Sequence, residues 1–276
     1  MKFPAYVSFW GACGRWLHLA FSVAVLVFLL LPLLVVMPLS FNSEPYFTYP
    51  MPGFSLRWYE TFIERDEWRL ALSNTLFIGV ASTLLATVLG VPAALGLMHP
   101  RLKGGAIVRG LLLSPMIVPA IITAVGVYFA FSPLGLVNSL TGLVLAHAAL
   151  GVPFIVVTVS ATLAGFNETL TRAGRSLGAG PLYVFWRIKL PLIAPGVISG
   201  ALFAFATSFD EVVVALFLAG ADQRTVPREM WSGVREQLSP TILAVATTLV
   251  LISALLLVTL EGLRRRSERL RGIQGA

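Results

Sequence analysis

Residues 110–167 read GLLLSPMIVPAIITAVGVYFAFSPLGLVNSLTGLVLAHAALGVPFIVVTVSATLAGFN and contain no Asp, Glu, Lys or Arg. A helix needs about 20 predominantly apolar residues to cross a bilayer, so this stretch is long enough for two crossings. Near its middle, residues 132–135 (SPLG) and 138–139 (NS) combine residue types that favour chain reversal. The stretch therefore predicts a tight hairpin of two transmembrane helices.

The same reading extends outward to other uncharged stretches of the chain. Residues 16–43, 70–100, 190–209 and 237–260 also lack Asp, Glu, Lys and Arg. The predicted spans are 17–39, 72–97, 106–131, 136–160, 196–219 and 241–263. The sequence thus predicts an all-α membrane protein in which residues 1–276 form one transmembrane domain, a six-span helical bundle.

The overall composition agrees with a membrane protein. Of the 276 residues 57% are hydrophobic and 12% charged, about half the roughly 25% of an ordinary soluble domain. A mean hydropathy of +0.85 leaves too few polar side chains to cover a soluble core. One cysteine and three scattered histidines offer no disulfide and no metal-ligand spacing, so no metal and no cofactor is expected.

The positive charges predict the orientation of the bundle. The six on one side of the predicted membrane are Arg57, Arg65, Arg69, Arg224, Arg228 and Arg235. The other fourteen of the 20 Lys and Arg residues lie on the side that holds both termini. Because positive residues resist translocation, both termini are expected to be cytoplasmic. The net charge of +7 is then explained by topology and anionic headgroups, and no nucleic-acid partner is expected.

The predicted cytoplasmic loop at about 165–195 carries a short amphipathic helix. Asn167 is a candidate N-cap, and the sequence Gly180-Pro181 is a stop signal. The apolar or small residues at helical spacing are Leu170, Ala173, Gly174 and Leu177. Such a helix either lies in the membrane interface or inserts into a groove of a cytoplasmic partner.

On the other side, residues 40–71 form a long loop crowded with aromatic residues and prolines. Trp and Tyr collect at headgroup depth, so part of this loop reads as an interfacial belt. Aromatic residues are also enriched at protein interfaces, so a docking surface for an outside partner is the alternative reading.

The sequence holds no catalytic constellation. It lacks a G-x-x-x-x-G-K-[ST] phosphate loop, an H-E-x-x-H motif and a Cys/His pair, so an enzyme is not expected and ATP hydrolysis would require a separate subunit. Ser208, in an apolar stretch, is interpreted as a helix-packing or backbone-bonding hydroxyl. Gly196 and Gly200 form a G-x-x-x-G pattern, which predicts close helix packing.

The cytoplasmic loop resembles the EAA loop of ABC-importer permeases, whose pattern is E-A-A, three residues, Gly, nine residues, then I-x-L-P. The matching positions here are Arg172, Ala173, Gly174, Gly178, Ile188, Leu190 and Pro191. Arg172 replaces the Glu and Gly174 the second Ala. In the family this helix transmits ATPase closure to the membrane, so the resemblance implies that these residues form a coupling helix between spans four and five. It does not say what the reversed charge at Arg172 does to ATPase pairing.

Three further stretches look like the second permease subunit of spermidine/putrescine importers: residues 53–59 (GFSLRWY), 68–75 (WRLALSNT) and 208–214 (SFDEVVV). The resemblance implies a multi-pass protein of the bacterial inner membrane that assembles with a second permease subunit, two copies of a cytoplasmic ATP-binding subunit and a periplasmic solute-binding protein. The second permease is a different homologous chain or an identical one.

The same resemblance implies a substrate class. Polyamines or similar small amines are expected, and phosphonates, amino-acid-like amines and opines remain alternatives because wider relatives carry them. A channel or ATP-independent secondary transporter is the competing class, which usually shows inverted repeats. No convincing repeat relates the two halves of this sequence.

Two acids, Asp210 and Glu211, lie inside the predicted fifth span. At 1.5 Å per residue, Asp210 is expected within about 5 Å of its midpoint. A carboxylate at that depth costs on the order of 2.5–3.5 kcal/mol, so it usually has a task. We expect Asp210 to face the substrate path with Glu211 as support; the alternative is a paired acid that holds helices together. Phe209, together with Tyr128 and Phe131 on the third span, is expected to offer cation–π contacts to a cationic amine if the three converge on the same passage.

Overall fold

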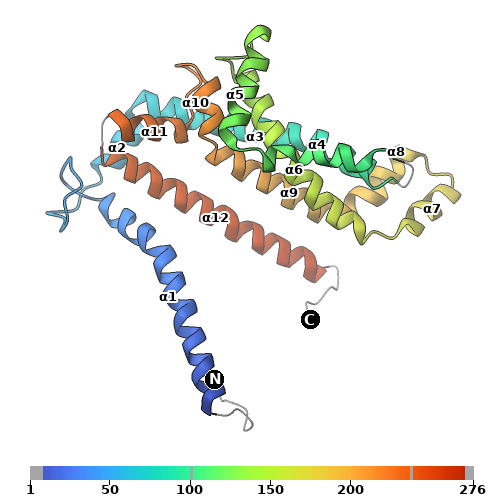
Figure 1. The fold of residues 1–276 in the computed structure, drawn as a ribbon, viewed down its shortest axis with the longest axis horizontal. Helices are drawn as coiled ribbons and strands as arrows, with labels where there is room; N and C mark the ends of the chain where they lie inside the picture. The colour runs from blue at the N-terminus through green and yellow to red at the C-terminus, as the bar shows by residue number, and fades with distance from the viewer. Residues whose placement is uncertain (1–8, 100–101, 237–238, 271–276) are drawn as a thin grey trace. The chain divides into compact units, whose positions relative to one another are not determined.

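The computed structural model describes residues 9–99, 102–236 and 239–270, and every regular element in these ranges is a helix (Figure 1). The chain divides into two compact units, one of residues 1–63 and 237–255 and one of residues 64–236 and 256–276. The larger unit holds α3 to α11 and carries the candidate site.

The elements follow one another in a simple order. They are α1 (Phe9–Leu39), α2 (Arg57–Glu64), α3 (Asp66–Leu97), α4 (Gly105–Ile117), α5 (Ala120–Phe131), η1 (Ser132–Leu134), α6 (Leu140–Ala164), α7 (Glu168–Ser176), α8 (Pro181–Val184), η2 (Phe185–Lys189), α9 (Leu190–Asp210), α10 (Val213–Leu218), α11 (Val226–Glu236) and α12 (Thr241–Leu270).

In the described part of the chain, four helical segments are long and apolar enough to cross a membrane. They are Cys13–Leu39, Asp66–Leu97, Leu140–Ala164 and Pro181–Asp210, and they overlap the predicted first, second, fourth and fifth spans. The bent pair α4 and α5 counts as a fifth if it is taken as one span. The described apolar part of α12, Thr241–Leu255, is shorter than these segments.

The predicted single span at 106–131 is wrong in its shape. The structure has two helices there, α4 and α5, which are bent by 109° at a short break. Val118 is extended (ψ 132°) and Pro119 follows it. Proline has no N–H and disfavours helical geometry in the residue before it, so the helix ends at this point.

The predicted boundaries of the fifth span, 196–219, are also wrong. The helix begins and ends earlier, as α9, and a separate short helix α10 follows. Glu211 leaves the helix in an extended conformation (φ −72°, ψ 115°), and its Oε1 accepts a hydrogen bond of 2.8 Å from the Val214 N–H in the first turn of α10. Asp210 is therefore the last residue of a helix and does not lie at its midpoint.

The residues expected to reverse the chain, 132–139, do form a turn between α5 and α6. The short helix η1 is followed by Gly135 at φ +66° and Asn138 at φ +58°, both in the left-handed region that Gly and Asn favour. Ser139 then caps α6 by accepting a hydrogen bond of 3.0 Å from the Gly142 N–H. The reversal delivers the chain into α6, the central helix of the larger unit.

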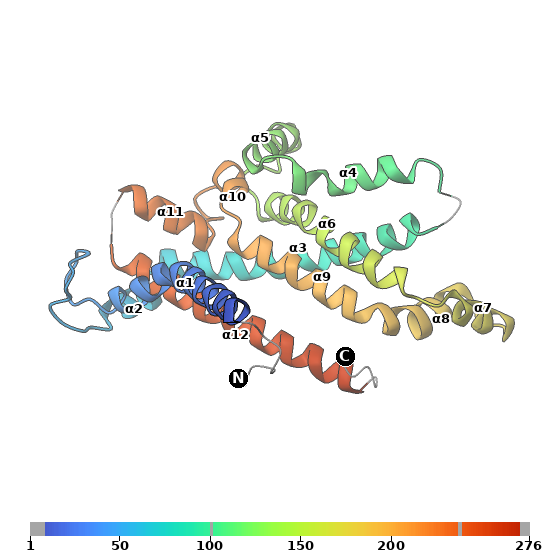
Figure 2. The same cartoon turned by 60° about the horizontal axis from the view of Figure 1, so that its bottom comes forward.

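The core of the larger unit is a trio of helices, α3, α6 and α9, which lie side by side in both views (Figures 1 and 2). Small residues let their backbones approach: a Cβ on Gly200 would lie 2.9 Å from Ile155 Cα, and one on Gly196 would lie 2.9 Å from the Thr158 carbonyl oxygen. The close packing predicted from the G-x-x-x-G pattern is confirmed. Both glycines of α9 contact α6.

Candidate functional site

The break between α9 and α10 brings the two acids to one surface. A concavity of 360 Å³ is lined by Ala206, Thr207, Asp210 and Glu211. A larger one of 520 Å³, between α10 and α11, contains neither acid. The smaller concavity combines two carboxylates, a hydroxyl and the C-terminal end of α9, whose last carbonyls lack helical partners. Such an arrangement is rich in acceptors and negative in potential, which suits a cationic group.

Two hydrogen bonds show which part of α6 lies next to this break. The Asn138 N–H donates to the Leu218 carbonyl at 2.8 Å, just before α6 begins. Ser208 Oγ lies 2.8 Å from Nδ1 of His147 on the second turn of α6. The break thus lies beside the first two turns of α6.

The two acids have different surroundings. The Glu211 side chain is half-buried, and its carboxylate accepts a hydrogen bond from the Val214 N–H at the start of α10. The Asp210 side chain is exposed, and no described residue forms an ion pair with it. The geometry therefore leaves Asp210 free to meet a ligand, while Glu211 holds the backbone beside it.

The three aromatic side chains expected at the path lie in different places. Phe209 is buried and stacks on Phe205, with ring centroids 5.7 Å apart. Phe131 packs against the cluster that includes Val214 on α10. Tyr128 is 37% exposed and meets Phe129 edge to face. Among the three, Tyr128 is the one whose ring keeps substantial exposed surface.

A buried polar cluster next to the break has no counterpart in the sequence prediction. Ser208 on α9 contacts Ser82 of α3 (Oγ to Oγ, 3.1 Å) as well as His147 of α6. The helix-packing role predicted for Ser208 is confirmed by these bonds. An apolar-run serine gives no sign of its partners, so Ser82 and His147 could have been found only from the helix pairing.

The predicted loop helix is present as α7. Asn167 Oδ1 accepts the Thr169 N–H at 2.9 Å, so its role as N-cap is confirmed. At the other end Gly178 adopts φ +86°, while the Gly178 and Ala179 N–H groups bond to the carbonyls of Arg175 (2.9 Å) and Gly174 (3.1 Å). This is a Schellman C-cap, which explains the glycine, and it ends the helix before Gly180-Pro181.

Packing inside the segment orients α7. Gly174 is buried, and a Cβ there would meet Ile188 Cδ1 at 2.7 Å, so the glycine allows η2 to lie directly against α7. Lys189 Nζ donates to Glu168 Oε1 at 3.0 Å across the same contact. This hydrogen bond lowers the pKa of Glu168, and its effect exceeds the opposing effect of partial burial. Leu190 and Pro191 begin α9, so α7 is tied directly to the start of a core helix.

The face of α7 and α8 turned away from this packing is open. Arg172 and Ala173 are exposed on α7. The large apolar side chains exposed beside them are Leu170 (45%), Leu177 (88%), Leu182 (74%), Tyr183 (60%) and Trp186 (61%). Of the residues expected on the apolar face, Gly174 packs inward, whereas Leu170, Ala173 and Leu177 are exposed.

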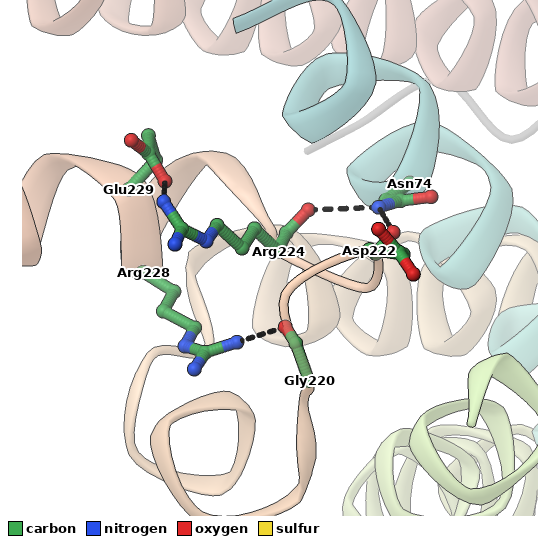
Figure 3. A network of polar contacts seen from close by, with 6 residues as sticks. All are labelled: Asn74, Gly220, Asp222, Arg224, Arg228 and Glu229. Carbon is green, nitrogen blue, oxygen red and sulfur yellow. Dashed lines mark hydrogen bonds and ion pairs between the residues drawn. The ribbon is translucent and has the colours of Figure 1, made fainter. Parts of the chain in front are cut away.

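A second polar cluster fixes the chain beyond α10 (Figure 3). The Asn74 side-chain amide on α3 donates to the carbonyls of Asp222 (2.9 Å) and Arg224 (3.0 Å). Arg224 pairs with Glu229 at 3.1 Å, and Arg228 donates to the Gly220 carbonyl at 2.6 Å. Burial and the neighbouring Arg224 lower the pKa of Arg228. These bonds hold α11 and its loop against α3.

In the smaller unit, the aromatic loop after α1 is held by its own hydrogen bonds. Asn42 is buried; its amide donates to the Tyr46 carbonyl (2.9 Å), and its carbonyl accepts from Trp58 Nε1 (2.7 Å). The exposed rings include Tyr49 (86%) and Phe54 (79%). A self-packed loop that presents aromatic rings fits both readings made from the sequence, and they stay open.

No group of three or more His, Cys, Asp and Glu side chains that could hold a metal gathers within residues 9–99, 102–236 and 239–270.

Comparison with known proteins gives one consistent family. Residues 86–270 match the family described as binding-protein-dependent transport system inner membrane component. The chain is similar to the spermidine/putrescine transport system permease protein PotC of Escherichia coli (strain K12), with 31% identity over 91% of this chain and 95% of that protein. It is equally 31% identical to the molybdenum transport system permease protein ModB of Mycobacterium bovis, over 89% of this chain and 92% of that protein.

A solved structure agrees in fold. A chain of a bacterial ABC transporter involved in the import of the acidic polysaccharide alginate superposes with a TM-score of 0.71, at 15% sequence identity, over 96% of this chain and 99% of that chain. The all-helical arrangement described here is therefore the fold of an ABC-transporter permease.

Proposed function

The chain belongs to the inner membrane component family of binding-protein-dependent transport systems, and from this membership we propose that it is a permease subunit that forms part of the path for polyamines or similar small amines in an ATP-driven importer. It is an inner-membrane permease similar to the spermidine/putrescine permeases. The solute and the partners are the parts that need argument and test.

Sequence identity alone does not assign the solute. PotC, named for spermidine and putrescine, and ModB, named for molybdenum, are both 31% identical to this chain. The charges of the site favour one class of solute: Asp210 is exposed at the break, in a concavity lined by two carboxylates. In a water-poor passage Coulomb attraction is weakly screened, so these charges favour an ammonium group and oppose an anion. This is the observation that carries the polyamine proposal.

The path itself is proposed to run past the α9–α10 break. Discontinuous helices are a recurrent way to present backbone carbonyls and helix ends to a solute in transport proteins. Asp210 is the residue proposed to meet the amine, and Glu211 supports it by capping α10. Of the aromatic residues, Tyr128 has the exposed ring needed for a cation–π contact, whereas Phe131 and Phe209 shape the surrounding packing.

The α7 segment is proposed as the coupling contact with a separate cytoplasmic ATP-binding subunit, which hydrolyses the ATP. Its exposed apolar side chains, with Leu177 and Leu182 the most exposed, suit insertion into a groove of a partner. Gly174 and Ile188 hold α7 against η2, so a push on α7 is passed to the start of α9. The Arg172 side chain, whose charge is opposite to that of the family's Glu, is exposed on the same segment. We expect it to pair with an acidic group on the ATPase.

The complete assembly is proposed to contain a second, different permease chain, two ATP-binding subunits and a periplasmic binding protein. The alginate transporter with 14% identity was solved in complex with a pentasaccharide-bound periplasmic protein and has a TM-score of 0.65 to this chain. Purification of this chain with its neighbours, followed by native mass spectrometry, measures the composition. A complex without an ATPase would favour the secondary-transporter alternative.

Six spans with both termini in the cytoplasm are proposed, with α4 and α5 together as the third and α12 as the last. A reporter enzyme active only in the cytoplasm should work when fused after Ala276 and fail when inserted near Glu64. The opposite pattern would overturn this topology. A reporter inserted beside Leu177 should also be active, because α7 is proposed to face the cytoplasm.

The function is tested by uptake of labelled putrescine into vesicles that contain the purified importer. The double variant Asp210→Asn, Glu211→Gln should lose most uptake at an unchanged level of complex. Asp222→Asn is a matched control, since it removes an exposed carboxylate but keeps the carbonyl that binds Asn74. Normal putrescine uptake by the double variant would refute the path and its support for a cation. Competition by molybdate, phosphonates or opines instead of polyamines would assign one of those solutes.

A further inference from the structure

Three helices meet in a buried hydrogen-bonded cluster directly beside the proposed path. Ser82 donates to Ser208 Oγ at 3.1 Å, and Ser208 lies 2.8 Å from His147 Nδ1. The exposed fractions are 1% for Ser82, 1% for His147 and 5% for Ser208. One residue comes from each of α3, α6 and α9, so the cluster fixes these helices to one another at a single level.

One polar atom of the buried cluster has no hydrogen-bond partner among the described residues, which lowers the stability of the fold. Ser82 Oγ lies within hydrogen-bonding distance of both the Gly79 carbonyl oxygen (3.2 Å) and Ser208 Oγ (3.1 Å), and Ser208 Oγ bonds to His147 Nδ1. The other ring nitrogen, Nε2, is buried and has no partner among the described residues, whether or not it carries the proton. A buried unsatisfied group costs about 1–3 kcal/mol, which an apolar residue of similar size would not incur. Stability alone therefore does not account for a histidine here.

The cluster lies two residues before Asp210. On one side of the break, Ser208 is bonded to two helices and Phe209 is buried against Phe205. On the other side, Glu211 is bonded to the Val214 N–H. Asp210 is the residue between these two anchored points whose side chain remains exposed. The backbone that carries its carboxylate is thus anchored on both sides.

We propose that His147 and Ser82 are positioning residues for the substrate, acting through Ser208 to fix the Asp210 carboxylate at the α9–α10 break. The inference rests on the proposed function, because it gives Asp210 the role of meeting an amine. The cluster sets the distance between that carboxylate and the rest of the path, so it governs which spacing of positive charges along a polyamine is accepted. Its loss alters affinity and selectivity more than the maximal rate.

The test is a double-mutant cycle on the complete importer in vesicles, with putrescine and spermidine as the solutes. His147→Leu removes the ring nitrogen to which Ser208 is hydrogen-bonded, and Asp210→Glu keeps the charge but moves it. Each single variant should raise the KM by about tenfold and change the putrescine-to-spermidine ratio, and the double variant should be little worse than either. Ser208→Ala should repeat the effect and Ser208→Thr should reverse most of it. Ser114→Ala, which removes a hydroxyl bonded within its own helix, is the matched control.

Additive effects of His147→Leu and Asp210→Glu, or a lower amount of assembled complex as the sole effect, would overturn the positioning role. If His147→Leu does not assemble, the Ser208→Ala and Ser208→Thr pair decides by the same criterion. These outcomes differ from failure of the proposed function, in which Asp210→Asn by itself leaves polyamine uptake unchanged.

Discussion

The two ends of α9 are fixed by opposite means. At its start, Lys189 and Glu168 form an ion pair whose side chains are 21% and 57% exposed, and Gly174 allows close contact with Ile188. At its end, Ser208 is held by buried hydrogen bonds to α3 and α6. Beside the first end, α7 and α8 expose apolar side chains. The second end exposes the carboxylate of Asp210.

The difference separates a docking end from a recognition end of the same helix. An exposed ion pair contributes about 0–1 kcal/mol, so the α7 segment is held mainly by shape, through Gly174 and the Gly178 cap. A buried polar cluster tolerates little change, because loss of one partner leaves the others unsatisfied. We therefore expect substitutions at the recognition end to have the larger effects.

The largest effect is expected at the recognition end. Asp210→Asn removes the exposed charge while it keeps the side-chain size, and putrescine uptake should fall at least about tenfold, the equivalent of 1.4 kcal/mol. Glu211→Gln should have a smaller effect, because an amide oxygen still accepts the Val214 N–H. Uptake rates at an equal level of complex measure both. A larger loss for Glu211→Gln would exchange the roles of the two acids.

At the docking end, Gly178 gives the next largest effect. An L-residue at φ +86° costs roughly 1–2 kcal/mol, and Asn tolerates it better than most. A Cβ at Gly178 meets nothing within 4 Å, so the new side chain projects outward. Gly178→Asp should lower both uptake and ATPase stimulation, and the isosteric Gly178→Asn should lower them less. Equal effects would mean that backbone strain, and not a charge at an ATPase groove, is responsible.

Gly174 tests the contact that joins α7 to η2. Gly174→Ala brings a Cβ against Ile188 Cδ1, so it should weaken coupling by about 1 kcal/mol. Ile188→Val removes that methyl group and should restore coupling in the double variant. ATPase activity per transported molecule is the measurement. A lack of rescue would show that the inward packing of Gly174 is not what α7 needs.

The smallest effect is expected for the ion pair. Glu168→Gln should cost at most about 1 kcal/mol and leave uptake at pH 7 nearly unchanged. The pKa of Glu168 is lowered below its ordinary 4.5 in the fold, so its stabilisation is complete above pH 4.5 and is lost as the pH falls through the lowered pKa. Thermal unfolding of the purified complex from pH 7 to pH 4 measures this. A large change in unfolding temperature with pH that Glu168→Gln abolishes would show that the ion pair contributes more to stability than expected.

The sequence predicted the helical class, the chain reversal at 132–139 and the α7 helix with its Asn167 cap, because each depends on local patterns. It could not predict the break at Val118–Pro119 in a run that is apolar throughout, since a proline in an apolar helix is compatible with either a kink or an end. The α9 boundary failed for a similar reason: the chain leaves the helix at Glu211, where the carboxylate instead caps α10.

The candidate site was predicted in part. The two acids stood out because charges are rare in apolar runs, and their different surroundings depend on the helix break that the sequence concealed. No local sequence pattern identified Ser82 and His147, because they form hydrogen bonds between helices that are far apart in the chain. Phe131 was expected to converge on the path from the third span, and the fold puts it against a packed cluster.

The hydrogen bond from Asn74 to the Arg224 carbonyl joins residues 150 positions apart. A ribosome adds roughly 5–20 residues per second, so α3 is made about 8–30 s before the loop that Asn74 binds. Throughout that interval the amide of Asn74 and the hydroxyl of Thr75, which later accepts the Val226 N–H, must find temporary partners. During biosynthesis, then, the bonds that hold this loop against α3 form only after residues 222–226 have been made, long after α3 itself.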